Sequence, residues 1–100
     1  MQTKELQKKA VEIVDAIDRK FSVSRDAQLN FTQLAEEIGE LAKDINKPRL
    51  RHTEPDRNNL EGEFADVFLL LSKQAEMAGV DIEKAVVRKI DIIKKRHGLD

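Results

Sequence analysis

Apolar residues recur at steps of three and four residues in the first half of the chain, which is the spacing of one face of an α-helix. A first stripe precedes a break at residues 22–24. It consists of Leu6, Ala10, Ile13, Ile17 and Phe21. A second segment runs from about Arg25 to Ile45, and Pro48 ends it because the residue before a proline disfavours the helical conformation. Its stripe consists of Leu34, Ile38, Leu41 and Ile45.

The second half of the chain predicts two more helices after a polar loop over residues 46–56. Asn58 and Glu61 have the spacing of a capping box and predict the start of the third helix, which ends near Gly79. Its apolar stripe consists of Leu60, Phe64, Val67, Leu71, Ala75 and Ala78. Asp81 is expected to cap the fourth helix, which ends before Gly98. The stripe of this helix consists of Val86, Ile90 and Ile93.

Four amphipathic helices joined by short turns at residues 22–24 and 79–81 predict an all-α, four-helix antiparallel bundle-like domain. A chain of 100 residues supports roughly one core, so we expect a single domain over residues 1–100. Phe68, Leu69, Leu70 and Met77 widen the apolar surface of the third helix beyond one stripe. An apolar surface of this width is usually buried against a second subunit. We therefore expect a homo-oligomer, either a homodimer or a homotetramer.

Charge and composition exclude several kinds of protein. The chain has no cysteine, which excludes disulfides, thiolate metal sites and cysteine nucleophiles. Its 18 basic and 19 acidic residues give a net charge of −1, with no general attraction to nucleic-acid polymers or anionic membranes. The longest apolar run, residues 67–71, is too short to span a bilayer, and the N-terminus lacks the apolar core of a signal peptide. We therefore expect a cytoplasmic protein without nucleic-acid or membrane partners.

Four carboxylates flank the apolar stripes of the second and third helices at matched offsets. At 100° per residue, Glu37 and Glu40 lie at about −60° and −120° from the leucine that opens their segment. Glu63 and Asp66 lie at about the same two angles from the leucine that opens theirs. In an antiparallel pair these acids would converge at the edge of the core. A hard divalent cation would relieve their mutual repulsion, and Mg²⁺ or Mn²⁺ suits carboxylate oxygens.

Two other interpretations of these acids need no such site. Acid pairs at this spacing are common on solvated helix faces, and a salt-bridge network with Lys43, Lys73 or Lys89 would also account for them. A di-iron helical bundle would need glutamate three residues before a histidine. Neither His52 nor His97 has a glutamate at that position, so the di-iron interpretation fails.

The motif Glu36-Glu37-x-x-Glu40, followed by Glu63-x-x-Asp66, resembles the EExxE…ExxD signature of the all-α nucleoside triphosphate pyrophosphohydrolases, the MazG-like family. The resemblance extends from about residue 25 to residue 98, and it includes the basic end of the last helix. It implies a Mg²⁺-dependent enzyme, with Mn²⁺ as an alternative cofactor. Its substrate would be a canonical or non-canonical nucleoside triphosphate, hydrolysed to the monophosphate and pyrophosphate.

The resemblance also implies roles for individual residues. The expected metal ligands are Glu37, Glu40, Glu63 and Asp66. Glu36 or Glu37 would be catalytic and would orient or deprotonate the attacking water. Lys89 and Arg96 would bind the phosphates, and Phe31 is the candidate for a base pocket. In many relatives an asparagine lies near the lysine of the last helix, whereas Asp91 occupies that neighbourhood here.

Two other functions stay open at this point. A phosphoribosyl-ATP pyrophosphohydrolase of the same superfamily would share the metal chemistry and differ in its substrate. A non-catalytic helical interaction module would carry the acids only as a solvated face. In that module, neutralising the acids would leave stability unchanged or improve it.

Overall fold

The computed structural model describes residues 2–100, and within this range the secondary structure is helical without strands. The helices are α1 (Thr3–Phe21), α2 (Ala27–Ile45), α3 (Lys47–Arg51), α4 (Arg57–Met77) and α5 (Ile82–Arg96). The predicted all-α class is confirmed, with one short helix more than the four expected. Every helix within residues 2–100 is too short or too polar to cross a lipid bilayer.

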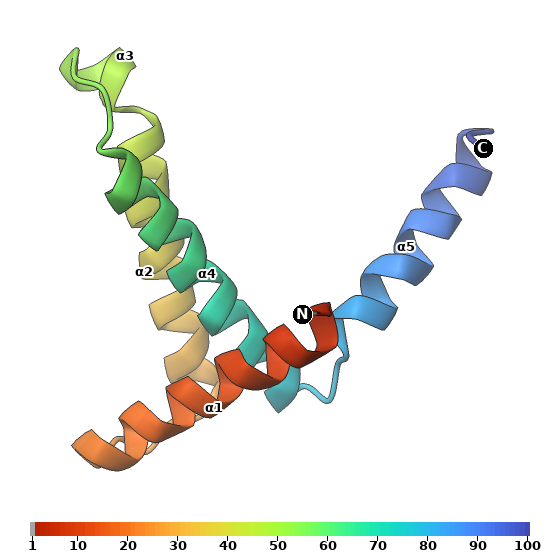
Figure 1. Cartoon of the computed structure of the whole chain (residues 1–100), viewed down its shortest axis with the longest axis horizontal. Coiled ribbons are helices and arrows are strands. Elements are labelled where there is room, and N and C mark those ends of the chain that lie inside the picture. The colour runs from red at the N-terminus through yellow and green to blue at the C-terminus, as the bar shows by residue number, and fades with distance from the viewer. Residues whose placement is uncertain (1) are drawn as a thin grey trace.

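The helices form an open arrangement around α4 (Figure 1). α2 and α4 lie side by side in antiparallel directions, and α1 packs across the C-terminal part of α4. α5 projects away from this group and contacts mainly α1. The radius of gyration is 16.3 Å, whereas a compact domain of this length has about 13 Å. A single copy of the chain therefore leaves much of its helical surface uncovered.

Aspartates cap the three helices that follow a turn or loop. Asp26, Asp56 and Asp81 each accept a hydrogen bond from a backbone N–H in the first turn of α2, α4 and α5, respectively. The cap predicted at Asp81 is confirmed, but the cap of α4 is Asp56 rather than Asn58. A carboxylate both accepts the N–H and interacts favourably with the positive end of the helix dipole. This explains why α4 starts earlier than the capping-box spacing indicates.

The segment predicted as a polar loop contains α3. Pro48 lies in the first turn of this short helix, where a missing backbone N–H removes no hydrogen bond. Asn46 alone separates α2 from α3, and Pro48 is compatible with the new helix. α3 ends at Arg51, and the C-cap residue His52 has a φ of 54°, in the left-handed region.

The contact between α2 and α4 follows a heptad-like spacing on both helices. The buried or half-buried residues of α2 along this contact are Asn30, Leu34, Glu37, Leu41 and Asp44. Those of α4 are Leu60, Glu63, Val67, Leu70 and Gln74. We call these two sets the inner lines. Three acids lie on them, whereas Ile38 and Phe64, both expected in the core, are about half exposed, at 49% and 55%.

The exposed apolar residues of α2 and α4 form a second stripe, which we call the outer apolar stripe. It consists of Phe31, Ile38 and Ile45 on α2 with Phe64 and Leu71 on α4. Each of them directly follows a residue of the inner line, and equivalent positions of an antiparallel pair lie on the same side of the pair. The stripe is thus a continuous apolar face that the chain itself leaves open.

Candidate functional site

The four acids at matched sequence offsets also occupy matched positions in the α2–α4 pair. Glu37 and Glu63 lie on the inner lines and are half-buried and buried, respectively. Glu40 and Asp66 are exposed and flank the inner lines on the side opposite the outer apolar stripe. Glu36, next to Glu37, is also exposed. We call these five residues the acidic strip.

Burial and neighbouring acids raise the pKa of the two inner members of the strip, Glu37 and Glu63. Burial raises the pKa of Glu37, and the charges of Asp66, Glu40 and Glu36 raise it further. Burial likewise raises the pKa of Glu63, with a smaller contribution from Glu40. Glu40 therefore interacts with both inner carboxylates, and the strip is a connected group of like charges.

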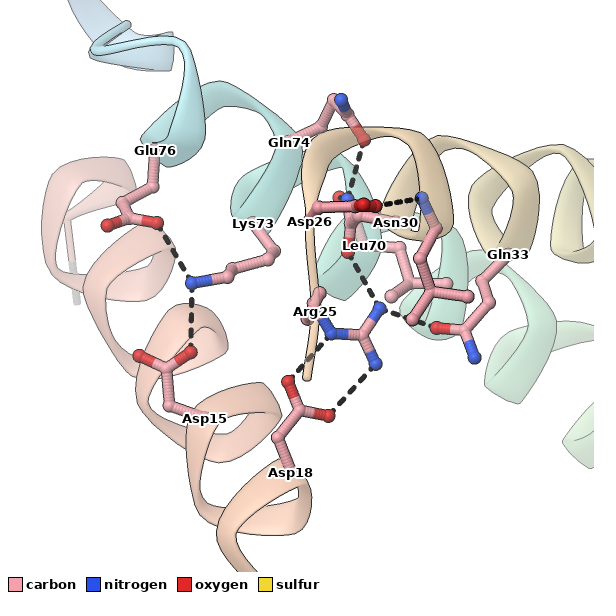
Figure 2. Close-up of polar contacts among 11 residues, drawn as sticks. Asp15, Asp18, Arg25, Asp26, Asn30, Gln33, Leu70, Lys73, Gln74 and Glu76 are labelled. Atoms are coloured by element: carbon pink, nitrogen blue, oxygen red, sulfur yellow. Dashed lines mark hydrogen bonds and ion pairs between the residues drawn. The ribbon is translucent and has the colours of Figure 1, made fainter. Parts of the chain in front are cut away.

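Basic side chains do not neutralise the acidic strip within residues 2–100, where none of its five acids forms an ion pair. Lys73 instead pairs with Asp15 at 2.9 Å and with Glu76 at 3.1 Å (Figure 2). The salt-bridge network considered from the sequence is therefore not the arrangement that this part of the chain adopts.

The chemistry of the strip fits a hard divalent cation. All of its potential ligands are carboxylate oxygens, the donors that Mg²⁺ and Mn²⁺ prefer. Glu63 is only 9% exposed, and its buried Oε2 has no hydrogen-bond partner. Within residues 2–100, however, no three acids or histidines stand close enough together to hold one ion as they lie. Shared coordination would require the exposed Glu40 and Asp66 side chains to rotate toward the inner carboxylates.

Asp44 is a further acid at this site that the sequence analysis did not single out. It is 4% exposed, and Asn59 Nδ2 lies 2.7 Å from its carboxyl group and 3.4 Å from that of Glu63. Its polar neighbours Glu63, Lys47 and Asn59 hold the pKa of Asp44 below its usual range. The signal that could have found it is its position seven residues after Glu37, which places both on one helix face.

A pocket of about 210 Å³ opens beside the strip, where α1 meets the α2–α4 pair. Its lining consists of Val14, Ile17, Arg25, Glu37, Asp66, Leu69 and Leu70. A larger cleft, of about 610 Å³, lies between α1 and the α4–α5 turn, but no acid of the strip lines it. The smaller pocket is therefore the candidate ligand site, because it combines apolar walls with two acids of the strip, Glu37 and Asp66.

Arg25 brings a positive charge to the wall of this pocket (Figure 2). Its guanidinium donates to both carboxylate oxygens of Asp18 and to the side-chain oxygens of Asn30 and Gln33. Asn30 is fully buried and donates to the backbone oxygen of Leu70 at 3.0 Å. The network thus ties the start of α2 to both α1 and α4. In the sequence, Arg25 stands at the start of the segment that resembles the family, with nothing that indicates its role.

The residues expected to bind phosphate and base are not next to the acids within one chain. Lys89 and Arg96 are exposed on α5, the helix that projects away from the α2–α4 pair. Phe31 is 60% exposed, belongs to the outer apolar stripe and does not line the pocket. A single copy therefore assembles the acids and Arg25 but leaves these three side chains elsewhere.

Comparison with known families identifies a match over most of the chain. Residues 25–98 match the MazG nucleotide pyrophosphohydrolase domain. This span begins at Arg25 and includes the acidic strip and α5, whereas α1 lies outside it. Curated proteins and solved structures give no significant match.

Proposed function

Because the chain belongs to the MazG nucleotide pyrophosphohydrolase domain family, we propose that it hydrolyses a nucleoside triphosphate, canonical or modified, to the monophosphate and pyrophosphate. The observation that carries this proposal is the acidic strip, which has no neutralising ion pair within residues 2–100 and borders a pocket with Arg25 in its wall. A cluster of uncompensated carboxylates suits a cation that arrives with a polyphosphate.

The proposed cofactor is Mg²⁺, with Mn²⁺ as an alternative. Its ligands would be Glu37, Glu40, Glu63 and Asp66. When bound, the cation would polarise phosphate oxygens and lower the pKa of a coordinated water. Glu63 supports this assignment most directly, because its buried Oε2 lacks any other partner.

Glu36 and Glu37 are the proposed catalytic acids. Glu36 is exposed at the edge of the strip, so its carboxylate can reach a water molecule that approaches from solvent. This carboxylate would accept the proton as the water oxygen bonds to the α-phosphorus. The bond from that phosphorus to the oxygen bridging to the β-phosphate breaks, and pyrophosphate leaves with the electron pair. Glu37 would take the same role if Glu36 only orients the water.

We also propose that the active enzyme is a homo-oligomer, a dimer or a tetramer, in which α5 of one copy completes the site of another. Lys89 and Arg96 belong to α5, which projects away from the α2–α4 pair that carries the acids (Figure 1). The outer apolar stripe and the half-exposed Val86 and Ile90 of α5 offer surfaces for such an assembly. The two basic side chains would then neutralise charge on the polyphosphate.

The proposal is tested by incubating the protein with Mg²⁺ and a panel of natural and modified triphosphates that includes phosphoribosyl-ATP. The expected result is stoichiometric release of pyrophosphate from at least one member of the panel. Preference for phosphoribosyl-ATP would assign the related activity of the same superfamily. Release of orthophosphate instead of pyrophosphate, or no turnover together with no metal binding, would contradict the proposal.

Variants of the strip test the residue assignments. Glu37→Gln and Asp66→Asn should each lose most of the activity, because each removes a negative ligand from the cation. The matched control is Glu61→Gln, an exposed acid of α4 whose side chain pairs with Arg57 outside the strip. This control should retain wild-type activity.

A further inference from the structure

A small polar cluster lies behind Glu63, at the end of the α2–α4 pair that is close to α3. Lys47 Nζ is 3.0 Å from Asp44 Oδ1, and Asn59 Nδ2 is 2.7 Å from Asp44 Oδ2. The same Asn59 nitrogen lies 3.4 Å from Glu63 Oε1. Asn59 thus bridges the carboxylates of two different helices.

The roles within this cluster follow from its donors and acceptors. An ionised carboxylate only accepts hydrogen bonds, so the amide of Asn59 must turn its NH₂ group toward both acids. Both oxygens of Asp44 are engaged, one by Lys47 and one by Asn59. In Glu63, by contrast, Oε1 faces the amide while Oε2 is buried without a partner. Asp44 is therefore an anchor for Asn59, whereas Glu63 keeps one oxygen free.

We propose that Asn59 is a positioning residue, which holds Glu63 through Oε1 so that Oε2 is presented to the divalent cation. This inference rests on the proposed metal-dependent function and extends it beyond the acids themselves. A hydrogen bond to the second oxygen of a carboxylate ligand fixes the orientation of that ligand before the metal arrives. Without the amide, the Glu63 side chain would lose one of the contacts that hold its rotamer.

The test measures binding of Mn²⁺ alone to the full chain, by isothermal titration calorimetry and by the electron paramagnetic resonance signal of free Mn²⁺. Asn59→Leu and Asn59→Ala should each weaken the affinity by about 10- to 100-fold, the usual effect of removing a residue that orients a metal ligand. The matched controls are Asn58→Leu and Asn58→Ala, which make the same changes one position earlier on α4. Asn58 forms no side-chain hydrogen bond among the described residues, so these controls should bind Mn²⁺ as the wild type does.

Asn59→Asp separates positioning from simple charge attraction. If only charge mattered, an added carboxylate would tighten Mn²⁺ binding. If positioning matters, this variant should bind Mn²⁺ more weakly, because it replaces the donor amide with a third acceptor beside two carboxylates. Tighter binding by Asn59→Asp would therefore overturn the inference.

The remaining outcomes distinguish this inference from the proposed function. Both Asn59 variants leave one oxygen of the buried Asp44 without its donor, so their metal-free melting temperature should fall below that of the Asn58 controls. Mn²⁺ binding is therefore measured at a temperature at which circular dichroism shows every variant to be folded. Wild-type affinity in Asn59→Leu and Asn59→Ala, together with loss of binding in Glu40→Gln, would overturn positioning but leave the metal site intact. No Mn²⁺ binding by the wild type would overturn both.

Discussion

Arg25 and Asp18 form a two-pronged ion pair that ties α1 to the start of α2. Nε of Arg25 donates to Oδ2 of Asp18 at 2.8 Å, and Nη2 donates to Oδ1 at 3.1 Å. Only 9% of the Arg25 side chain and 11% of the Asp18 side chain are exposed. Because Asp18 precedes the span that matches the family and Arg25 begins it, this contact attaches α1 to the family domain.

Replacing Arg25 by methionine should destabilise the protein by about 3 kcal/mol, since removing one partner leaves a buried charge without compensation. The change also deprives Asn30 and Gln33 of a shared donor. Urea denaturation followed by circular dichroism would measure the loss. The control is Arg57→Met, which removes an exposed pair with Glu61 and should cost less than about 1 kcal/mol. Equal losses of unfolding free energy in the two variants would show that the Arg25 network contributes no more stability than an exposed ion pair.

The stabilising effect of Asp18 should depend on pH in the acid range. The hydrogen bond from Arg25 holds the pKa of Asp18 below its ordinary value of 3.8. A lowered folded-state pKa gives stability that is fully present above the ordinary value and is lost as the pH falls through the folded-state value. Asp18→Asn should therefore lower the melting temperature at pH 7, by an amount that shrinks below about pH 3.8. A difference that stays constant from pH 7 to pH 2.5 would contradict this coupling.

The local sequence contains most of the information that sets the helices. Apolar periodicity, the break at Ser22 and the cap at Asp81 depend on neighbouring residues only, and the helices lie close to where these features predict them. The inner lines were harder to predict because three of their members are acids. Hydrophobicity favours Ile38 over Glu37 as a core residue, but the packing of α4 on α2 places Glu37 inside and Ile38 outside.

The candidate site was predictable only where the sequence repeats itself. The matched acid pairs place Glu40 and Asp66 at equivalent positions of an antiparallel pair, which follows from helix geometry alone. Asp44 and Arg25 were missed for a different reason. Each gains its environment from a partner on another helix, and helical periodicity within one segment carries no information about that partner.

Mg²⁺ should stabilise the wild type much more than it stabilises Glu37→Gln. Without metal, Glu37→Gln should be the more stable of the two proteins. Since burial and neighbouring charges raise the pKa of Glu37, its ionised form is unfavourable in the metal-free fold. Glu37→Gln should raise the metal-free melting temperature at pH 8. Saturating Mg²⁺, at about 100 times its Kd, adds about 2.7 kcal/mol to the wild type and should add far less to this variant. Scanning calorimetry with and without Mg²⁺ checks both effects.

The control for that experiment is Glu61→Gln, which leaves the acidic strip unchanged. It should respond to Mg²⁺ as the wild type does. An equal Mg²⁺ response in Glu37→Gln would remove this residue from the ligand set. A lower metal-free melting temperature in Glu37→Gln would show that the repulsion within the strip is relieved in another way.

The outer apolar stripe should mediate self-association. Phe64 lies near its centre and is 55% exposed in the single chain. A charge buried in an oligomer interface without a partner is strongly unfavourable, so Phe64→Asp should shift the protein to monomers. Light scattering after size-exclusion chromatography would measure the mass. Leu50→Asp, a matched change at an exposed residue of α3 outside the stripe, should leave the oligomer intact. A monomeric wild type, or an oligomeric Phe64→Asp, would exclude this face as the interface.

If α5 of one copy completes the site of another, two inactive variants should restore activity when they are combined. One is Glu40→Gln, which damages the acidic strip, and the other is Lys89→Gln with Arg96→Gln, which damages α5. Loss of a cation that stabilises the developing phosphate charge costs about 10²- to 10³-fold in rate, so each variant alone should be nearly inactive.

A mixed dimer contains one site in which intact acids meet an intact α5 from the other copy. In a purified twofold heterodimer one of the two sites is intact, so recovery should approach about half of the wild-type activity. The two variants would be co-expressed with different affinity tags, and pyrophosphate release would be measured on the doubly purified complex. The control combines Glu40→Gln with Asp66→Asn, both of which damage the strip. This pair should recover nothing, because each of its sites contains one damaged strip. No recovery in the first mixture would place Lys89 and Arg96 at the site of their own chain. Recovery in the control would show instead that one acidic strip combines acids of two copies.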